Sequence, residues 1–457
     1  MIKDDKAKKP SGESSCASDA EDLERARNSP EGATGPRPWY KWLGPGLITG
    51  AADDDPSGVG TYSADGAQYG YGLLWLIPLS LPLMIAIQEM CGRIATVTGC
   101  GLAAVIKEHY PKWLLFSSVA LLVGANVFNI YADINVMAAT GKLLFGLPVW
   151  AGVVGLSLFL VASQILVPYR SYARWLKYLC IGLAGYAVVA FMPGAHNNWV
   201  QIGKSMFIPQ LKINADSALA VVAFLGTTIS PYLFFWQAGE TVEEKIAQGD
   251  ANEPGDQSRP VPPVAFRRVR ADTTLGMMVS QAVAFFILIA AAGTLHATGK
   301  TDINSADEAA RALSPLGPSA VWIFSLCIIG TGLLAVPTLA GSVAYSVAEV
   351  FGWRYGLYRR FSRARRFYLT LALVIVVGSV FNFVGVISPV KALVYSAALN
   401  GIVAPPLIVV LLLICNNKRI VKGRTNRVWS NVFGWLTVAV MGPAAIYLIY
   451  ATFAGKA

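Results

Sequence analysis

Long apolar stretches separated by short polar segments dominate this chain. Eleven such stretches follow residue 38, and most are about 20 residues long, the length a helix needs to cross the hydrocarbon core of a bilayer. We therefore predict an all-α integral membrane protein with eleven transmembrane helices. The spans are expected at about 42–66, 72–95, 114–142, 147–168, 175–193, 217–245, 272–294, 318–346, 367–386, 388–415 and 428–453.

Two of these stretches are interrupted by small residues and a proline. The first interruption, Asp53 to Gly58, reads DDDPSG, and the second, Gly226 to Pro231, reads GTTISP. Proline removes a backbone donor and clashes with the preceding turn, so each helix should stop before it and restart there. The interruptions lie five spans apart, at corresponding positions of two halves, which is typical of inverted-repeat transporters with a site at the membrane midplane.

This pattern predicts four parts. Residues 1–38 are rich in Ser, Pro, Gly and charge, and we expect them to be a disordered cytoplasmic tail without a signal peptide. Residues 39–195 should form a first five-helix repeat and residues 196–416 a second one. Residues 417–457 should hold the eleventh helix and the C-terminus.

The net charge of +10 could indicate a nucleic-acid partner, but the placement of Lys and Arg gives a simpler account. Most of them fall in the N-terminal segment and in alternate loops, which predicts a multi-pass plasma-membrane protein with a cytoplasmic N-terminus. Glu89 and Arg93 are four residues apart and should form an ion pair on one helix face. The six cysteines show no CxxC spacing and are expected to be reduced packing residues.

Three adjacent carboxylates, Asp53, Asp54 and Asp55, stand at the first interruption of an otherwise apolar span. An acid inside a membrane is costly without a partner, and oxygen ligands around a gap suit a hard cation. We therefore expect Asp55 to bind a metal ion, with the other two raising the negative potential or accepting hydrogen bonds from metal-bound water. A structural role as a helix cap or as a buried acid stays open for each of the three.

Four segments of the chain, GPGLITGAADDDPSG, QEMCGRIATVTG, LLFGLPVWAGV and FLGTTISPYLFF, resemble helix signatures of the Nramp family of divalent-metal transporters. The resemblance covers nearly all of the chain after residue 38. It implies a LeuT-type fold with broken first and sixth helices. It also implies a metal site made by an Asp-Pro-Gly-Asn break on the first helix and an Ala-x-x-Met-Pro-His break on the sixth.

Matched by position, the metal-binding aspartate of the family falls on Asp55 and its asparagine on Gly58. The sixth-helix methionine falls on Ser230, and the carbonyls that line the site would be those of Ala52 and Thr227. The remaining functional positions of the family, in chain order, fall on Ile130, Asp133, Tyr232, Gln237 and Ala397, and the polar residue nearest to the last of these is Asn400. Asp133 is a further candidate beside the metal, or it is a structural acid that pairs with Lys142.

These departures from the family pattern have chemical consequences. Thioether sulfur suits soft metals whereas oxygen suits Mg²⁺ and Mn²⁺, so serine in place of methionine favours a hard cation. Glycine in place of asparagine leaves room for the waters that Mg²⁺ retains. The pattern resembles the Nramp-related magnesium transporter branch, which implies uptake of Mg²⁺, and of Mn²⁺ as well.

Proton coupling needs titratable groups inside the membrane, and the histidine positions of the family hold Tyr232 and Gln237 here. We therefore predict uncoupled alternating access driven by the membrane potential, which gives a divalent ion about 4.6 kcal/mol per 100 mV. One alternative is a proton-coupled Mn²⁺/Fe²⁺ transporter of the Nramp type, and another is a Na⁺-coupled organic-solute carrier of the same fold. The chain has no HExxH motif that would indicate an intramembrane metallo-enzyme, so we expect no enzyme activity. We also expect no cofactor and no nucleic-acid partner, and a monomer in the bilayer.

Overall fold

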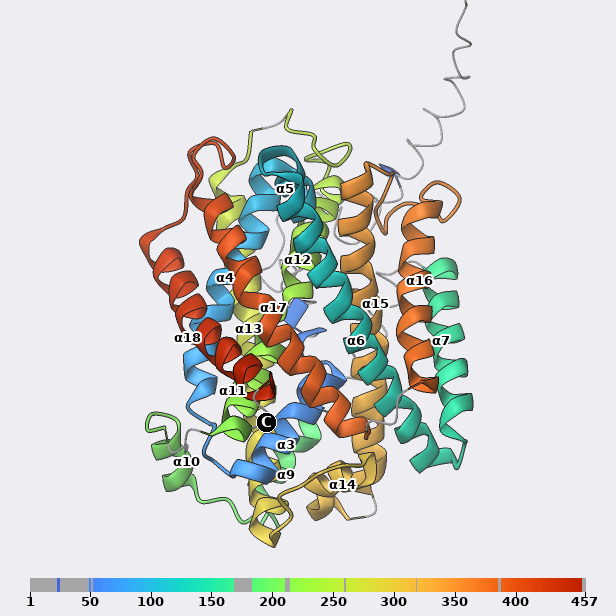
Figure 1. Ribbon diagram of the computed structural model, residues 1–457, viewed down its shortest axis with the longest axis vertical. Helices are drawn as coiled ribbons and strands as arrows, with labels where there is room; N and C mark the ends of the chain where they lie inside the picture. Colours follow the sequence, from blue (N-terminus) through green and yellow to red (C-terminus); the bar gives the residue numbers. More distant parts are fainter. Residues whose placement is uncertain are drawn as a thin grey trace, which may run out of the picture.

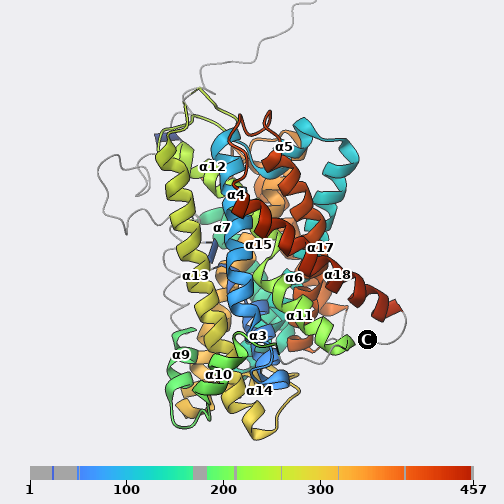
Figure 2. The same ribbon diagram turned by 90° about the vertical axis from the view of Figure 1, so that its left-hand side faces the viewer.

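The computed structural model describes residues 23–24, 49–50, 52–167, 183–209, 214–258, 260–317, 319–384 and 388–453, and this part of the chain is helical without a β-strand. Figures 1 and 2 show long helices that run along one common axis, with short helices gathered at the two ends of the bundle. The helices, in chain order, are α3 (Pro56–Tyr69), α4 (Leu76–Thr98), α5 (Leu102–His109), α6 (Lys112–Phe145), α7 (Val149–Leu166), α9 (Ala184–Phe191), α10 (Trp199–Ser205), α11 (Ala215–Thr228), α12 (Pro231–Ala247), α13 (Pro263–Thr294), η3 (His296–Thr298), α14 (Ala306–Ala310), η4 (Arg311–Leu316), α15 (Ser319–Phe351), α16 (Arg365–Val380), η5 (Phe381–Phe383), α17 (Pro389–Asn416) and α18 (Val428–Phe453).

Nine elements of the described chain are long and apolar enough to cross a membrane, with α11 and α12 counted together. They match the second to fourth and the sixth to eleventh predicted spans. Most of the first half of span one, and residues 175–182 of span five, lie outside the described residues. The predicted tail, 1–38, also lies outside them, apart from residues 23 and 24, so the tail and the repeat boundaries stay predictions.

The helices differ in how much apolar surface they leave uncovered. Only 28% of the apolar window is buried in α7 and in α18, and 39% in α16, whereas 83% is buried in the α11–α12 pair. Apolar side chains that no protein covers need a hydrocarbon environment. We conclude that α7, α16 and α18 face lipid, while the broken pair lies in the interior.

Both helix breaks occur where the prolines predict them. Asp55 has an extended backbone, with φ −70° and ψ 171°, and α3 begins at Pro56. Ser230 is also extended, with φ −75° and ψ 131°, and α12 begins at Pro231. Proline fits the first position of a helix, where its missing N–H costs nothing, but it cannot continue the helix that precedes it.

Glycines allow the central helices to approach each other closely. A Cβ atom at Gly226 of α11 would overlap the backbone of Ala397 and Gly401 in α17, and one at Gly66 of α3 would overlap the carbonyl of Leu288 in α13. Small residues at such crossings let membrane helices gain van der Waals contact without side chains between them. The two broken helices are thereby held against the continuous helices α13 and α17.

Candidate metal site

The two helix breaks lie against each other inside the bundle. The Ser57 hydroxyl, in the first turn of α3, is 3.5 Å from the Thr227 hydroxyl near the end of α11, 170 positions away in the sequence. One turn further along α3, the Tyr62 hydroxyl is 3.0 Å from the Thr228 hydroxyl. The fold therefore brings both interruptions to one place, as a midplane site requires.

Asp55 accepts more hydrogen bonds than the other carboxylates at this junction. Its Oδ1 accepts hydrogen bonds from the Gly58 amide and from the Ser57 hydroxyl, both at 2.7 Å, and its Oδ2 accepts one from Asn129 Nδ2 at 3.0 Å. The residue is 1% exposed, and it caps the N-terminus of α3, whose dipole favours a negative charge there. Each oxygen keeps lone-pair capacity for a cation.

Asn129 and Asn400 were not predicted as a connected pair. Asn400 of α17 donates from Nδ2 to the Oδ1 of Asn129 on α6 at 3.3 Å, and Asn129 in turn donates to Asp55. The Oδ1 of Asn400 has no hydrogen-bond partner among the described residues. This amide oxygen is a further ligand candidate, linked to the Asp55 carboxylate through Asn129.

The sequence does hold a signal for Asn129. Asn126, Asn129 and Asp133 follow each other at spacings of three and four residues in the apolar helix α6, so they lie on one face. All three are 0% exposed. A polar stripe inside a membrane helix indicates a functional interior face.

The other two acids of the DDD cluster point toward α13. Ser280 of α13 lies with its hydroxyl 2.6 Å from Oδ2 of Asp53 and 3.3 Å from Oδ1 of Asp54. A hydroxyl has one proton, so the shorter bond to Asp53 is the stronger of the two. The Oδ1 of Asp53 is buried without a partner among the described residues. Ser280 contacts both acids, and their part at the metal site stays a prediction.

Asp133 is the least compensated acid of the group. It is 0% exposed, neither carboxylate oxygen accepts a hydrogen bond of normal length from the described residues, and the Ser57 amide faces it only at longer range. A buried carboxylate without a partner is costly, so a proton or a cation has to neutralise it.

The two predicted carbonyl ligands already carry hydrogen bonds in this conformation. Tyr232 donates to the carbonyl of Ala52 at 2.9 Å. The Ser230 hydroxyl lies 2.8 Å from the carbonyls of both Gly226 and Thr227. A carbonyl oxygen has two lone pairs, so each of these carbonyls keeps one lone pair that could bind a metal ion.

Gly58 contributes space and a backbone donor. A Cβ atom there would lie 3.3 Å from the Thr227 hydroxyl and 3.5 Å from Oδ1 of Asp55, so any side chain would enter the site itself. Within the described residues, no three His, Cys, Asp or Glu side chains converge closely enough to hold a metal ion. A metal at Asp55 must therefore complete its shell with neutral oxygens and water, as Mg²⁺ and Mn²⁺ do.

Comparison with known proteins places the chain in a family. The model of the Nramp family, described as natural resistance-associated macrophage protein-like, matches residues 46–451, which is most of the chain. The chain belongs to the Nramp family. The divalent metal cation transporter MntH of Bacillus subtilis (strain 168) is 26% identical over 430 residues, which are 90% of this chain and 92% of that protein. MntH of Klebsiella pneumoniae (strain 342) is 26% identical over 427 residues, or 91% and 95% of the two chains.

Solved structures agree with this Nramp architecture. A manganese transporter of Eremococcus coleocola, in complex with an aromatic bis-isothiourea substituted compound, has a TM-score of 0.70 at 20% identity, over 93% of this chain and 89% of that one. Mhp1, a nucleobase-cation-symport-1 family transporter in a closed conformation, has a TM-score of 0.54 at 14% identity, over 90% and 93% of the chains. At such identities the likeness shows the fold alone, and it confirms the predicted LeuT-type architecture.

The tenth-helix ligand position of the Nramp family stays a prediction, and two residues of α17 are candidates for it. The tenth-helix ligand position was matched to Ala397, but the carbonyl of Ala397 packs against Gly226 of α11. Asn400, three residues further along α17, reaches the site through Asn129. Local sequence similarity left both residues open, because it does not set the rotation of a helix about its axis.

The positions of this chain that were matched to the proton route of other Nramp proteins hold non-titratable or weakly titratable groups. Ile130 is buried against Gly378 of α16, and Gln237 accepts a hydrogen bond from the Thr49 hydroxyl at 2.6 Å. Tyr232 is engaged with the Ala52 carbonyl. Among these three positions no imidazole is available, and the titratable groups near the site are its aspartates.

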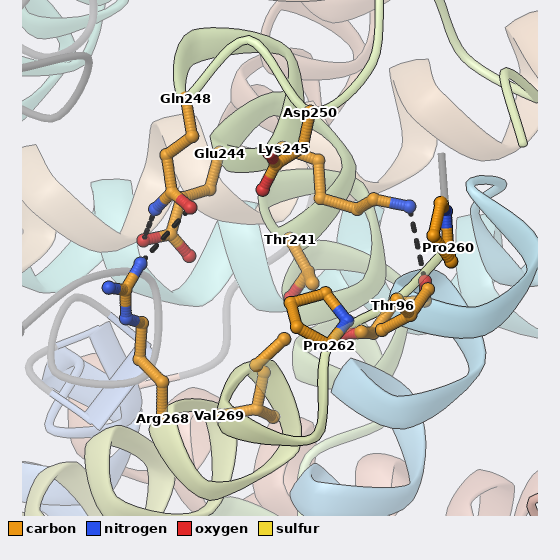
Figure 3. Close-up of a pocket in the computed structure, with 12 residues that line it drawn as sticks. Thr96, Thr241, Glu244, Lys245, Gln248, Asp250, Pro260, Pro262, Arg268 and Val269 are labelled. Atoms are coloured by element: carbon orange, nitrogen blue, oxygen red, sulfur yellow. Dashed lines mark hydrogen bonds between the residues drawn. The ribbon is translucent and has the colours of Figure 1, made fainter. Parts of the chain in front are cut away.

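A small cavity of about 60 Å³ marks the far end of α12, away from the acids (Figure 3). Lys245 of α12 donates to the carbonyl of Thr96 in α4 at 3.1 Å, and Arg268 of α13 donates to the side chain of Gln248 at 3.0 Å. The lining of this cavity holds two basic side chains, Lys245 and Arg268, and two acidic ones, Glu244 and Asp250, so it has no excess of negative charge. Its hydrogen bonds tie the end of α12 to two continuous helices, and they must break if α12 moves during transport.

Proposed function

We propose that this Nramp protein is an alternating-access carrier of divalent metal cations, with Asp55 as the metal-binding carboxylate. The observation that carries the proposal is the contact between two helix breaks around a buried Asp55 whose oxygens are oriented by three donors. Its relatives in Bacillus and Klebsiella are named divalent metal cation transporters, which supports a carrier and argues against a metallo-enzyme. A cytoplasmic N-terminus and a monomeric state stay predictions.

Mn²⁺ is the substrate that the relatives and the site chemistry support together. The MntH proteins and the Eremococcus manganese transporter favour the Nramp-type interpretation over one restricted to Mg²⁺. The candidate ligands are a carboxylate, carbonyls, a hydroxyl and an amide oxygen, and Mn²⁺ accepts all of these. Four buried acids also argue against a carrier of organic anions, whose carboxylate they would repel.

Proton exchange at Asp133 is our proposal for coupling. Both of its oxygens lack a hydrogen-bond partner among the described residues, so the carboxyl needs a proton whenever no cation is close. Arrival of a divalent ion at Asp55 would supply the compensating charge and release that proton. In this proposal Asp133 takes the role of the histidines that other Nramp proteins use, because this chain has no histidine at positions 232 and 237.

Uncoupled uptake of Mg²⁺ is the second candidate. It is favoured by Ser230, which offers oxygen where sulfur would select softer metals, and by Gly58, which adds no ligand and leaves space for water. The membrane potential alone could drive such uptake, at about 4.6 kcal/mol per 100 mV for a divalent ion.

A metal panel in proteoliposomes separates the two candidates. Uptake of Mn²⁺, Mg²⁺, Fe²⁺ and Cd²⁺ is measured at a clamped membrane potential, with a pH-sensitive dye in the lumen. Acidification in step with Mn²⁺ entry, abolished in Asp133→Asn, supports proton exchange at Asp133. Mg²⁺ entry at an unchanged lumenal pH would instead support the uncoupled candidate, and transport of none of these ions would overturn the proposed function.

A further inference from the structure

A large basic cavity lies beside the first half of α13. Its volume is about 820 Å³, and it is bounded by α4, by the first half of α13 and by the segment that precedes α18. Figure 1 shows that segment, the red connection between α17 and α18, near one end of α4. The charged residues of the lining are five arginines and one glutamate, which leaves an excess of four positive charges: Arg93, Arg267, Arg270, Arg424, Arg427 and Glu89.

Glu89 compensates only part of this charge. Its Oε1 lies 2.7 Å from Arg93 and 2.7 Å from Arg270, so the predicted ion pair with Arg93 is confirmed and a second arginine shares the same carboxylate. Arg93 also donates to the carbonyl of Thr425 at 3.3 Å and to Asn426 Oδ1 at 3.0 Å. These bonds hold the segment before α18 against α4 and fix the shape of the cavity wall.

Three arginines of the lining have no such compensation. Arg267, Arg424 and Arg427 are exposed and form no ion pair with the described residues. Arg424 is placed over the ring of Phe266 at 5.5 Å, a stacking contact that orients its guanidinium. Guanidinium groups gathered around one cavity repel each other, and their planar N–H forks match the oxygens of a phosphate.

One face of α13 changes from basic to apolar along this cavity. The lining residues Arg267, Arg270, Thr274, Leu275 and Met278 follow each other at helical spacings, so they lie on one side of the helix. Arg270 and Met278 are about 12 Å apart along the axis, and Met278 is 51% exposed. A surface with guanidinium groups at one end and uncovered apolar groups at the other fits a lipid, with its headgroup at the arginines.

The neighbouring tryptophan places the arginines at headgroup level. Trp429, in the first turn of α18 and two residues after Arg427, is 71% exposed. Exposed Trp at the end of a membrane helix is typical of the interface between hydrocarbon and water. A soluble phosphate compound would need neither the apolar wall nor this depth.

We propose that this cavity binds the phosphate-bearing headgroup of an anionic membrane lipid, whose acyl chain lies along Leu275 and Met278. Basic pockets between membrane helices are suited to such headgroups. Free phosphate shares the same recognition chemistry, so the test must separate the two sources. The proposal does not depend on which metal the protein carries.

The test uses the purified full-length protein in a neutral detergent, with thermal unfolding followed by intrinsic fluorescence. Phosphatidylglycerol, phosphatidylcholine and inorganic phosphate are titrated separately. We expect a saturable rise of Tm with phosphatidylglycerol alone. In the double variant Arg267→Gln/Arg427→Gln the midpoint should increase about 30-fold, the equivalent of about 2 kcal/mol for two arginines.

The matched control is Arg360→Gln/Arg365→Gln, which removes two exposed arginines from a different basic segment, the loop before α16 and the first residue of that helix. It should keep the wild-type midpoint. If the control weakens the response as much as the pocket variant does, the effect is general charge attraction and the proposal is wrong. It is also wrong if phosphatidylglycerol produces no saturable shift, and a shift by inorganic phosphate alone would retain the phosphate site but exclude the lipid.

Discussion

Replacing Asn129 by alanine should weaken metal binding, although Asn129 itself is not a proposed metal ligand. Its Nδ2 donates to Oδ2 of Asp55 at 3.0 Å, and its Oδ1 accepts from Asn400 at 3.3 Å. The other two donors to the carboxylate, the Ser57 hydroxyl and the Gly58 amide, both bind Oδ1. The variant therefore leaves Oδ2 without its partner and frees Asn400 as well.

The expected size of the effect follows from these contacts. A hydrogen bond to a charged group contributes about 1.5–3 kcal/mol, and loss of a group that orients a metal ligand typically lowers affinity by about 10- to 100-fold. We expect the Kd for Mn²⁺, measured by isothermal titration calorimetry in detergent, to rise within that range. Mn²⁺ uptake in proteoliposomes should show the same loss at low metal concentration and recover at high concentration.

Asn126→Ala is the matched control. Asn126 lies one turn earlier on α6 and is equally buried, and its Nδ2 donates to the Leu339 carbonyl at 2.9 Å and to the Ser342 hydroxyl at 2.7 Å. It should lower Tm by breaking the contact with α15 while the Kd for Mn²⁺ stays at the wild-type value. A wild-type Kd in Asn129→Ala, or an equal loss of affinity in both variants, would refute the orienting role.

Four further predictions concern the site, the packing and a thiol. Asp55→Ala should abolish metal uptake at unchanged surface expression, and wild-type uptake in this variant would remove the central assignment. Ser230→Met adds a soft ligand and should shift competition in favour of Cd²⁺ over Mg²⁺; an unchanged order would place residue 230 outside the metal shell. Gly226→Ala should lower Tm, because its Cβ would overlap α17, at a typical overpacking cost of about 1–3 kcal/mol. Gly124→Ala, with open space around its Cβ, is the control and should not lower it. Burial raises the pKa of the Cys100 thiol, between α4 and α5, to about 11, so little thiolate exists at neutral pH. In a variant with Cys100 as its single cysteine, maleimide labelling should be slow at pH 7 and accelerate about tenfold per pH unit; rapid labelling at pH 7 would contradict the raised pKa of this half-buried thiol.

The sequence alone predicted that the chain is a membrane protein and where two of its helices break. A run of about 20 apolar residues has one stable solution in a bilayer, a helix. Pro56 and Pro231 end the preceding helix because each lacks an N–H, whatever surrounds it. The acid cluster at Asp55 was also readable from the sequence, because carboxylates inside an apolar span are rare and costly.

Only the tertiary structure could show which residues of other helices form hydrogen bonds with the residues of the site. Asn129, Asn400 and Ser280 lie 74 or more positions from the acids or amides they bind, on three different helices. Whether Ala397 or Asn400 faces the site depends on how α17 is rotated about its axis, which the close crossing at Gly226 determines. Sequence spacing specifies which residues share one face of a helix. Which faces meet is decided by the crossing of helices far apart in the chain, because the packing energy of all of them together selects that arrangement.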